Sequence, residues 1–141
     1  MKYILDTNVI SEAINKQPNL QVMNWLRGMD AQDLYLSVVT VGEIKKGVEK
    51  LPESHRKQTI KDWFENDLLI KFDGQILTLD LSIILVWGKL VGELEQQGRK
   101  LPALDSLIAA TAKYYNYTLV TRNEKDFAGI DITIFNPFKI S

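Results

Sequence analysis

Two kinds of hydrophobic pattern alternate along this chain. Short runs of apolar and β-branched residues are typical of buried strands, while longer segments with apolar residues three or four positions apart are typical of helices that bury one face. Strands are predicted over 2–5, 34–39, 75–79, 118–121 and 131–135, and helices over 8–15, 19–29, 41–50, 53–70, 81–97 and 105–116. Because helical segments separate the strands, we expect an α/β fold: a three-layer α/β/α domain with a mostly parallel sheet of about five strands.

Polar residues and glycines indicate where these helices begin and end. Thr40 is placed to cap the helix over 41–50, and Glu43 follows three residues later, which is the spacing of a capping box. Gly98 is placed to end the helix over 81–97, and Trp87 within that helix is expected in the core. His55, in the first turn of the segment 53–70, is expected to be exposed to solvent.

Length and composition narrow the class of protein. A chain of 141 residues, 45% of them hydrophobic, can form a single domain over 1–141. The formal net charge of −1 gives no overall basic field, so any binding site for a polyanion must be local. The absence of cysteine excludes disulfides, thiolate nucleophiles and thiolate zinc sites. With no membrane-length apolar segment and no secretory pattern at the N-terminus, we expect a cytoplasmic protein.

Four acidic residues are expected at one edge of the sheet. They are Asp6 after the first strand, Glu43 after the second, Asp105 opening the helix before the fourth, and Asp126 after the fourth. Each alone is explained as a helix cap, and for Asp6 a cap is the better explanation in isolation. Together at one edge they would repel one another unless a cation neutralised them. Oxygen ligands suit Mg²⁺ or Mn²⁺ rather than zinc.

The same residues limit the chemistry. Catalysis by a pair of histidines is excluded because the chain has one histidine, and no serine has a histidine partner. A P-loop is absent. A phosphotransfer receiver needs an acidic pair after the first strand, and an aspartyl-phosphate phosphatase needs a second aspartate where Asn8 stands. Metal-assisted hydrolysis of a phosphodiester remains.

Several motifs, in order along the chain, resemble those of PIN-domain ribonucleases, and most of all the VapC and FitB type toxins of type II toxin-antitoxin pairs. They are L-D-T-N-V-I-S-E from Leu5, V-T-V-G-E-I-K-K-G from Val39, L-P-A-L-D-S-L-I-A-A-T-A from Leu101, L-V-T-R-N-E-K-D-F from Leu119, and F-N-P-F from Phe135. The resemblance spans Met1 to Phe138 and implies a PIN-like domain.

The resemblance implies an endoribonuclease that depends on Mg²⁺ or Mn²⁺ and often forms a dimer. A small antitoxin protein that also binds operator DNA would inhibit it. The catalytic, metal-binding acids of the family correspond to Asp6, Glu43 and Asp105. The fourth position falls on Asp126 or on Asn123, which stands where many relatives have an aspartate.

Other residues are assigned supporting roles. Asn8, Thr121 and Asn123 are expected to hydrogen-bond with the acids and orient them, with Thr7 and Asn8 capping the first helix. Six basic residues near the acids are candidates to contact RNA phosphates, with Lys46 and Arg122 preferred; the others are Lys45, Arg99, Lys100 and Lys125. The alternative function is a catalytically weak binding partner that regulates transcription together with a DNA-binding antitoxin.

Overall fold

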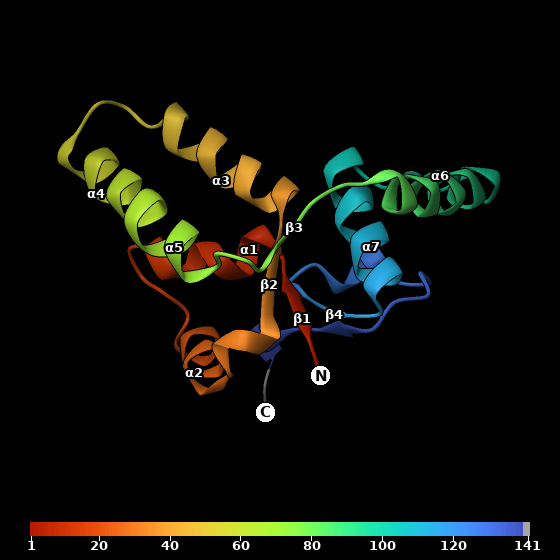
Figure 1. The fold of residues 1–141 in the computed structure, drawn as a ribbon, viewed down its shortest axis with the longest axis horizontal. Helices are drawn as coiled ribbons and strands as arrows, with labels where there is room; N and C mark the ends of the chain where they lie inside the picture. Colours follow the sequence, from red (N-terminus) through yellow and green to blue (C-terminus); the bar gives the residue numbers. More distant parts are fainter. Residues whose placement is uncertain (140–141) are drawn as a thin grey trace.

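The sheet at the centre of the molecule has five strands, all parallel, in the order β3-β2-β1-β4-β5 (Figure 1). The computed structural model describes residues 1–139. The strands are β1 (Tyr3–Leu5), β2 (Leu34–Ser37), β3 (Ile76–Leu77), β4 (Thr118–Val120) and β5 (Ile134–Phe135). Strand β1 pairs through Tyr3 with Leu34 on one side and with Thr118 on the other. The prediction of a parallel sheet of about five strands is confirmed.

Helices cover both faces of this sheet. The α-helices are α1 (Thr7–Ile10), α2 (Leu20–Gly28), α3 (Val38–Lys50), α4 (His55–Trp63), α5 (Leu69–Lys71), α6 (Leu81–Gln96) and α7 (Ala103–Tyr115). Shorter elements are the 3₁₀ helices η1 (Ser11–Ile14), η2 (Ala31–Asp33), η4 (Glu124–Phe127) and η5 (Pro137–Lys139), and the π-helix η3 (Phe64–Leu68). Figure 1 shows α3, α4 and α5 on one side of the strands and α6 and α7 on the other.

Alternate residues of the central strands feed two separate hydrophobic cores. Leu5 and Val120 point into the core formed with helices α1 to α5, whereas Ile4 and Leu119 point into the core formed with α6 and α7. All four side chains are fully buried. Strands buried on both faces read as continuous apolar runs, which is the pattern from which they were predicted.

The largest difference from the predicted elements lies at the start of α3. Strand β2 ends at Ser37, whose hydroxyl oxygen accepts a hydrogen bond from the backbone N–H of Val39 at 3.1 Å. The prediction that Thr40 caps this helix is wrong, because Thr40 lies inside it and is fully buried. Glu43 is six residues beyond the cap, so it takes no part in a capping box.

Other boundaries shift by a few residues. The segment predicted as a helix over 53–70 begins at His55, after a cap by Ser54, and passes through the π-helix. The predicted helix over 8–15 divides into α1 and η1, and the strands predicted over 75–79 and 131–135 retain two residues each. His55 is exposed, as expected, and Trp87 is half-buried against the α6–α7 core.

The described part of the chain contains no helix that is long and apolar enough to cross a bilayer. The domain expected over 1–141 includes residues 140 and 141, which lie outside the described residues. The N-terminus lies on the side of the sheet opposite the carboxyl ends of β1 and β2 (Figure 1).

The buried hydroxyl of Thr40 gives a prediction about stability. Its oxygen has no hydrogen-bond partner within residues 1–139, so the fold carries the desolvation cost of an unpaired polar group. Thr40→Val keeps the shape and the β-branch, and we expect it to raise the free energy of unfolding by about 1 kcal/mol.

Thr111 is the matched control, since it is also fully buried in a helix but donates its hydroxyl to the Leu107 carbonyl at 2.8 Å. Thr111→Val is expected to lower the free energy of unfolding by about 1 kcal/mol. Urea denaturation measures both changes. Destabilisation of equal size in the two variants would show that Thr40 is not unpaired.

Candidate functional site

Asp6 lies at the carboxyl end of β1, the central strand. From β1 the strand order runs through β2 to β3 on one side and through β4 to β5 on the other. The carboxyl end of β1 is therefore the switch point of the sheet, where ligands bind in open parallel α/β folds. The carboxylate is only 3% exposed. It accepts hydrogen bonds from the Thr7 backbone N–H and the Thr121 hydroxyl, both at 2.8 Å, and from the Asn8 amide at 3.3 Å.

These bonds also make Asp6 the cap of helix α1, so the expectation that Thr7 and Asn8 replace it in that role is wrong. Asn8 instead connects two strand ends. Its amide donates to the Thr121 hydroxyl at 3.4 Å, and its carbonyl accepts from the backbone N–H of Arg122 at 3.0 Å. The segment after β4 is thereby tied to the segment after β1, and Asp6 is held from both.

Glu43 reaches the same edge from α3. The Thr7 hydroxyl donates to the Glu43 carboxylate at 2.8 Å, while the Thr7 backbone N–H donates to Asp6. One threonine therefore joins two of the four acids. Its bond to Glu43 spans 36 positions, and no local sequence pattern could have revealed that contact.

Asp105 lies in the first turn of α7, half-buried, and its carboxylate has no hydrogen-bond partner within residues 1–139. Burial, and after it the negative charges of Asp6, Glu43 and Asp126, together raise its pKa to about 6. The four acids predicted from the strand ends thus lie within electrostatic reach of one another.

Two residues, Asp126 and Asn123, are candidates for the fourth position of the site. Asp126 is exposed in η4, and its negative charge contributes to the raised pKa of both Asp6 and Asp105. The backbone N–H of Asn123 donates a hydrogen bond to the Thr121 hydroxyl at 3.1 Å. Its side-chain amide forms no hydrogen bond with any of the acids in the described residues. Of the two, Asp126 places charge at the acid cluster.

The donor set suits a hard divalent cation. It consists of oxygen atoms alone, and no basic side chain within residues 1–139 forms an ion pair with any of the four acids. Burial raises the pKa of Asp6 in spite of its three hydrogen-bond donors. In the described residues no three acidic, histidine or cysteine side chains are close enough together to enclose a metal ion.

The basic residues proposed to contact RNA lie in different settings. Lys46 is exposed and lines a shallow hollow of about 220 Å³ together with Glu43. The guanidinium of Arg122 lies over the ring of Phe138, 4.8 Å from its centroid. Arg99 donates to backbone carbonyls of the segment that carries Asp126, a role not predicted from the sequence.

The fold and this edge define the class: an α/β/α domain with a cluster of uncompensated carboxylates at the switch point of a parallel sheet. The model of the PIN domain family matches residues 3–132. The chain belongs to the PIN-domain family.

Relatives of known identity resemble the chain over nearly its whole length. It is 36% identical over 135 residues to Toxin FitB of Neisseria gonorrhoeae, covering 96% of this chain and 97% of that protein. It is 30% identical over 136 residues to VapC ribonuclease Y4jK of Sinorhizobium fredii, covering 96% and 97%. A chain in the structure of FitAB bound to an IR36 DNA fragment superposes with a TM-score of 0.93 at 35% identity, covering 99% of this chain and 97% of that one.

The raised pKa of Asp105 predicts a pH-dependent effect on stability. Because the pKa in the folded state is about 6, above the usual value of 3.8, ionisation of Asp105 costs stability as the pH rises through 6, and below 3.8 that cost is absent. Asp105→Asn mimics the protonated side chain. In EDTA it should leave the stability nearly unchanged at pH 4. At pH 8 it should raise the free energy of unfolding by about 1 kcal/mol after allowance for solvent screening, and so raise the melting temperature.

Asp131→Asn removes an exposed carboxylate that precedes β5, at the opposite edge of the sheet, and serves as the control. It should show no such difference between the two pH values. A gain in melting temperature for Asp105→Asn that is equal at pH 4 and pH 8 would contradict the electrostatic origin.

Proposed function

We propose that the protein is an endoribonuclease that depends on Mg²⁺ or Mn²⁺ and acts as the toxin of a toxin-antitoxin pair. The observation that carries the proposal is the cluster of Asp6, Glu43, Asp105 and Asp126, whose charges act on one another and which form no ion pair with a basic side chain of residues 1–139. Support also comes from the relatives, one named a toxin and another a ribonuclease.

In this proposal Asp6, Glu43 and Asp105 hold the cation, with Asp126 at the fourth position. A divalent ion bound there would polarise a phosphoryl oxygen and lower the pKa of a bound water. The chain's own contribution is orientation. Thr7 and Thr121 bond to different oxygens of Asp6, which fixes the plane of its carboxylate, and Thr7 holds one oxygen of Glu43.

The same charges explain why the residues alone are a poor site for RNA. Four carboxylates repel a phosphodiester, so substrate binding requires that their charge be neutralised first. Burial and the charges of the other acids raise the pKa of Asp105 to about 6, so a cation bound there would favour its ionised form. Lys46, next to Glu43, and Arg122, beside the end of β4, are proposed to bind the phosphates on either side of the cleaved bond.

Asp6→Asn is the direct test of this assignment. Asparagine caps a helix as well as aspartate does and keeps one carbonyl oxygen for the Thr7 N–H, so the fold should be retained with an equal or higher melting temperature. Loss of the charge should reduce Mn²⁺ affinity and lower the rate of RNA cleavage by at least about 100-fold. Cleavage of labelled RNA and calorimetric titration with MnCl₂ measure the two effects.

Asp131→Asn should cleave RNA as the unchanged protein does. A large fall in melting temperature for Asp6→Asn would indicate that the carboxylate is needed for folding rather than for a metal. If the unchanged protein, freed of partners, shows no turnover with Mg²⁺ or Mn²⁺, the alternative function as a regulatory binding partner is favoured.

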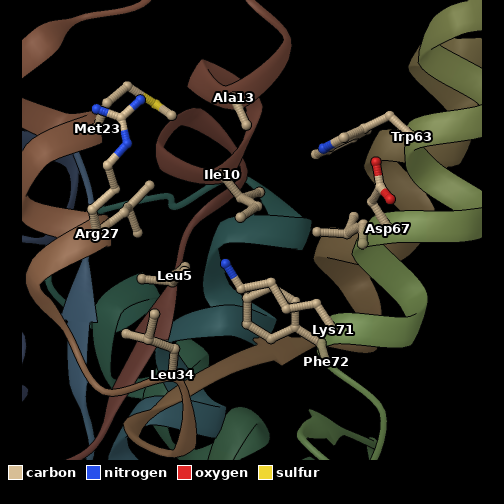
Figure 2. Close-up of a pocket in the computed structure, with 12 residues that line it drawn as sticks. Leu5, Ile10, Ala13, Met23, Arg27, Leu34, Trp63, Asp67, Lys71 and Phe72 are labelled. Atoms are coloured by element: carbon tan, nitrogen blue, oxygen red, sulfur yellow. The ribbon is translucent and has the colours of Figure 1, made fainter.

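A groove beside helix α2 is proposed to bind the antitoxin. It has a volume of about 310 Å³ and lies between α2 and the continuous helical segment formed by α4, η3 and α5. Figure 2 shows Met23 and Ala13 on one wall and Trp63 and Asp67 on the other. The lining is mostly apolar, with Arg27, Asp67 and Lys71 at its edges, which suits an amphipathic segment of a small protein.

A second copy of the chain is also expected to bind, since the resemblance implies a homodimer. Exposed apolar residues of α6 offer a surface for such pairing: Leu81 is 73% exposed and Leu85 is 65% exposed.

Met23→Glu tests the antitoxin groove because it places a charge on an apolar wall. Co-expressed with the proposed antitoxin, the tagged variant should recover at least about 10-fold less of that partner than the unchanged protein does. Leu20→Glu is the control, since Leu20 is 72% exposed on the same helix and does not line the groove. Equal recovery with both variants would place the partner elsewhere.

A further inference from the structure

The connection between α6 and α7 fixes the backbone of Arg99. Gly98 has a φ of +72°, which a glycine adopts readily, and its N–H donates to the Glu95 carbonyl at 3.0 Å. The N–H of Arg99 donates to the Leu94 carbonyl at 2.9 Å. Together these two bonds form a Schellman motif, which ends the helix and sets the direction in which the Arg99 side chain leaves it.

That side chain reaches the segment carrying Asp126. Its Nη2 donates to the backbone carbonyl of Asp126 at 2.8 Å, and its Nη1 donates to the carbonyl of Ala128. Gly129 makes room for this contact. It has a φ of +80°, and a Cβ atom there would lie 3.3 Å from Nη1 of Arg99. The planar fork of the guanidinium therefore spans two carbonyls of one turn.

Few contacts other than the hydrogen bonds from Arg99 hold Asp126 in place. Its side chain is exposed and makes no hydrogen bond within the described residues. The turn around it is closed by long bonds, from the N–H of Asp126 to the Asn123 carbonyl at 3.2 Å and from Ala128 to Lys125 at 3.3 Å. Buried Phe127 anchors the segment in the core, but it does not fix the direction of the neighbouring carboxylate.

Electrostatic repulsion also acts on the Asp126 carboxylate. The negative charges of Asp6 and Asp105 push Asp126 away from the edge of the sheet, and no basic side chain among residues 1–139 pairs with its carboxylate. Two charge-assisted hydrogen bonds from a fixed guanidinium are strong enough to oppose that repulsion.

We propose that Arg99 is a positioning residue, which holds the Asp126 segment at the acid cluster and so sets metal affinity and turnover without contacting RNA. The inference rests on the proposed function, in which Asp126 completes the cation site. It differs from the expectation that Arg99 binds phosphate. A phosphate contact requires only positive charge, whereas the two carbonyls require the fork of an arginine.

The test compares Arg99→Gln, Arg99→Lys, Asp126→Asn and the double variant Arg99→Gln/Asp126→Asn in the full chain. Lys113→Gln, which removes an exposed positive charge from α7, is the matched control. Three properties are measured for each: Mn²⁺ affinity by calorimetry, kcat and KM for RNA cleavage, and the melting temperature.

Both Arg99→Gln and Arg99→Lys should lose about 10- to 100-fold in Mn²⁺ affinity and in kcat, as is usual when a residue that orients a metal ligand is removed. The KM for RNA should stay within about twofold. In the Asp126→Asn background, Arg99→Gln should cause no further loss, because the residue that it positions is already without charge.

Three results would overturn the proposal. Full activity of Arg99→Lys, with a raised KM alone for Arg99→Gln, would make Arg99 a phosphate contact. Losses that multiply in the double variant would show a role unrelated to Asp126. Mn²⁺ affinity unchanged by Arg99→Gln would show that the turn keeps its position unaided. If the unchanged protein cleaves no RNA, the proposed function fails, yet the Mn²⁺ titrations still decide the role of Arg99.

Discussion

The rest of the structure is arranged around one buried acidic side chain, Asp6, at the end of the central strand. Asp6 is 3% exposed, and a carboxylate in such surroundings is costly unless donors surround it. The donors come from the turn into α1 and from the segment after β4. Holding this charge therefore requires that β1, β4 and α1 be assembled in one arrangement, and the same bonds leave Asp6 aligned at the sheet edge.

The other acids of the cluster are affected by the buried carboxylate of Asp6. Glu43 is joined to Asp6 through Thr7, while Asp105 has no hydrogen-bond donor within residues 1–139. Burial, and after it the charges of the other acids, raises the pKa of Asp105. Like charges gathered at the switch point lower the stability of the fold and are retained where a site needs them. The hydrogen bonds around Asp6 and Glu43 fix the orientation of these two carboxylates, on which the proposed cation site depends.

Much of the fold and the acids of the site could be predicted from the sequence, because both follow from local patterns. Buried strands read as apolar runs, and an acid directly after such a run is placed at the sheet edge by topology alone. What could not be predicted depends on contacts distant in sequence. The Thr7 bond to Glu43 and the Arg99 bonds to the Asp126 segment need the folded backbone. The start of α3 was missed for another reason: Ser37 and Thr40 are both good caps, and the end of β2 decides between them.

The fourth acid shows how a departure from the family pattern can be accommodated. Asn123 occupies the place next to Thr121, where its backbone bonds to the threonine hydroxyl and its amide brings no charge. Asp126 lies three residues later, and the 3₁₀ turn of η4 compresses that distance, since one turn of such a helix spans three residues. The Asp126 carboxylate is exposed, and the charges of Asp6 and Asp105 repel it. In the role proposed for Arg99, its hydrogen bonds to this turn hold an acid that is shifted along the chain, so that its charge acts at the same edge of the sheet as Asp6 and Asp105.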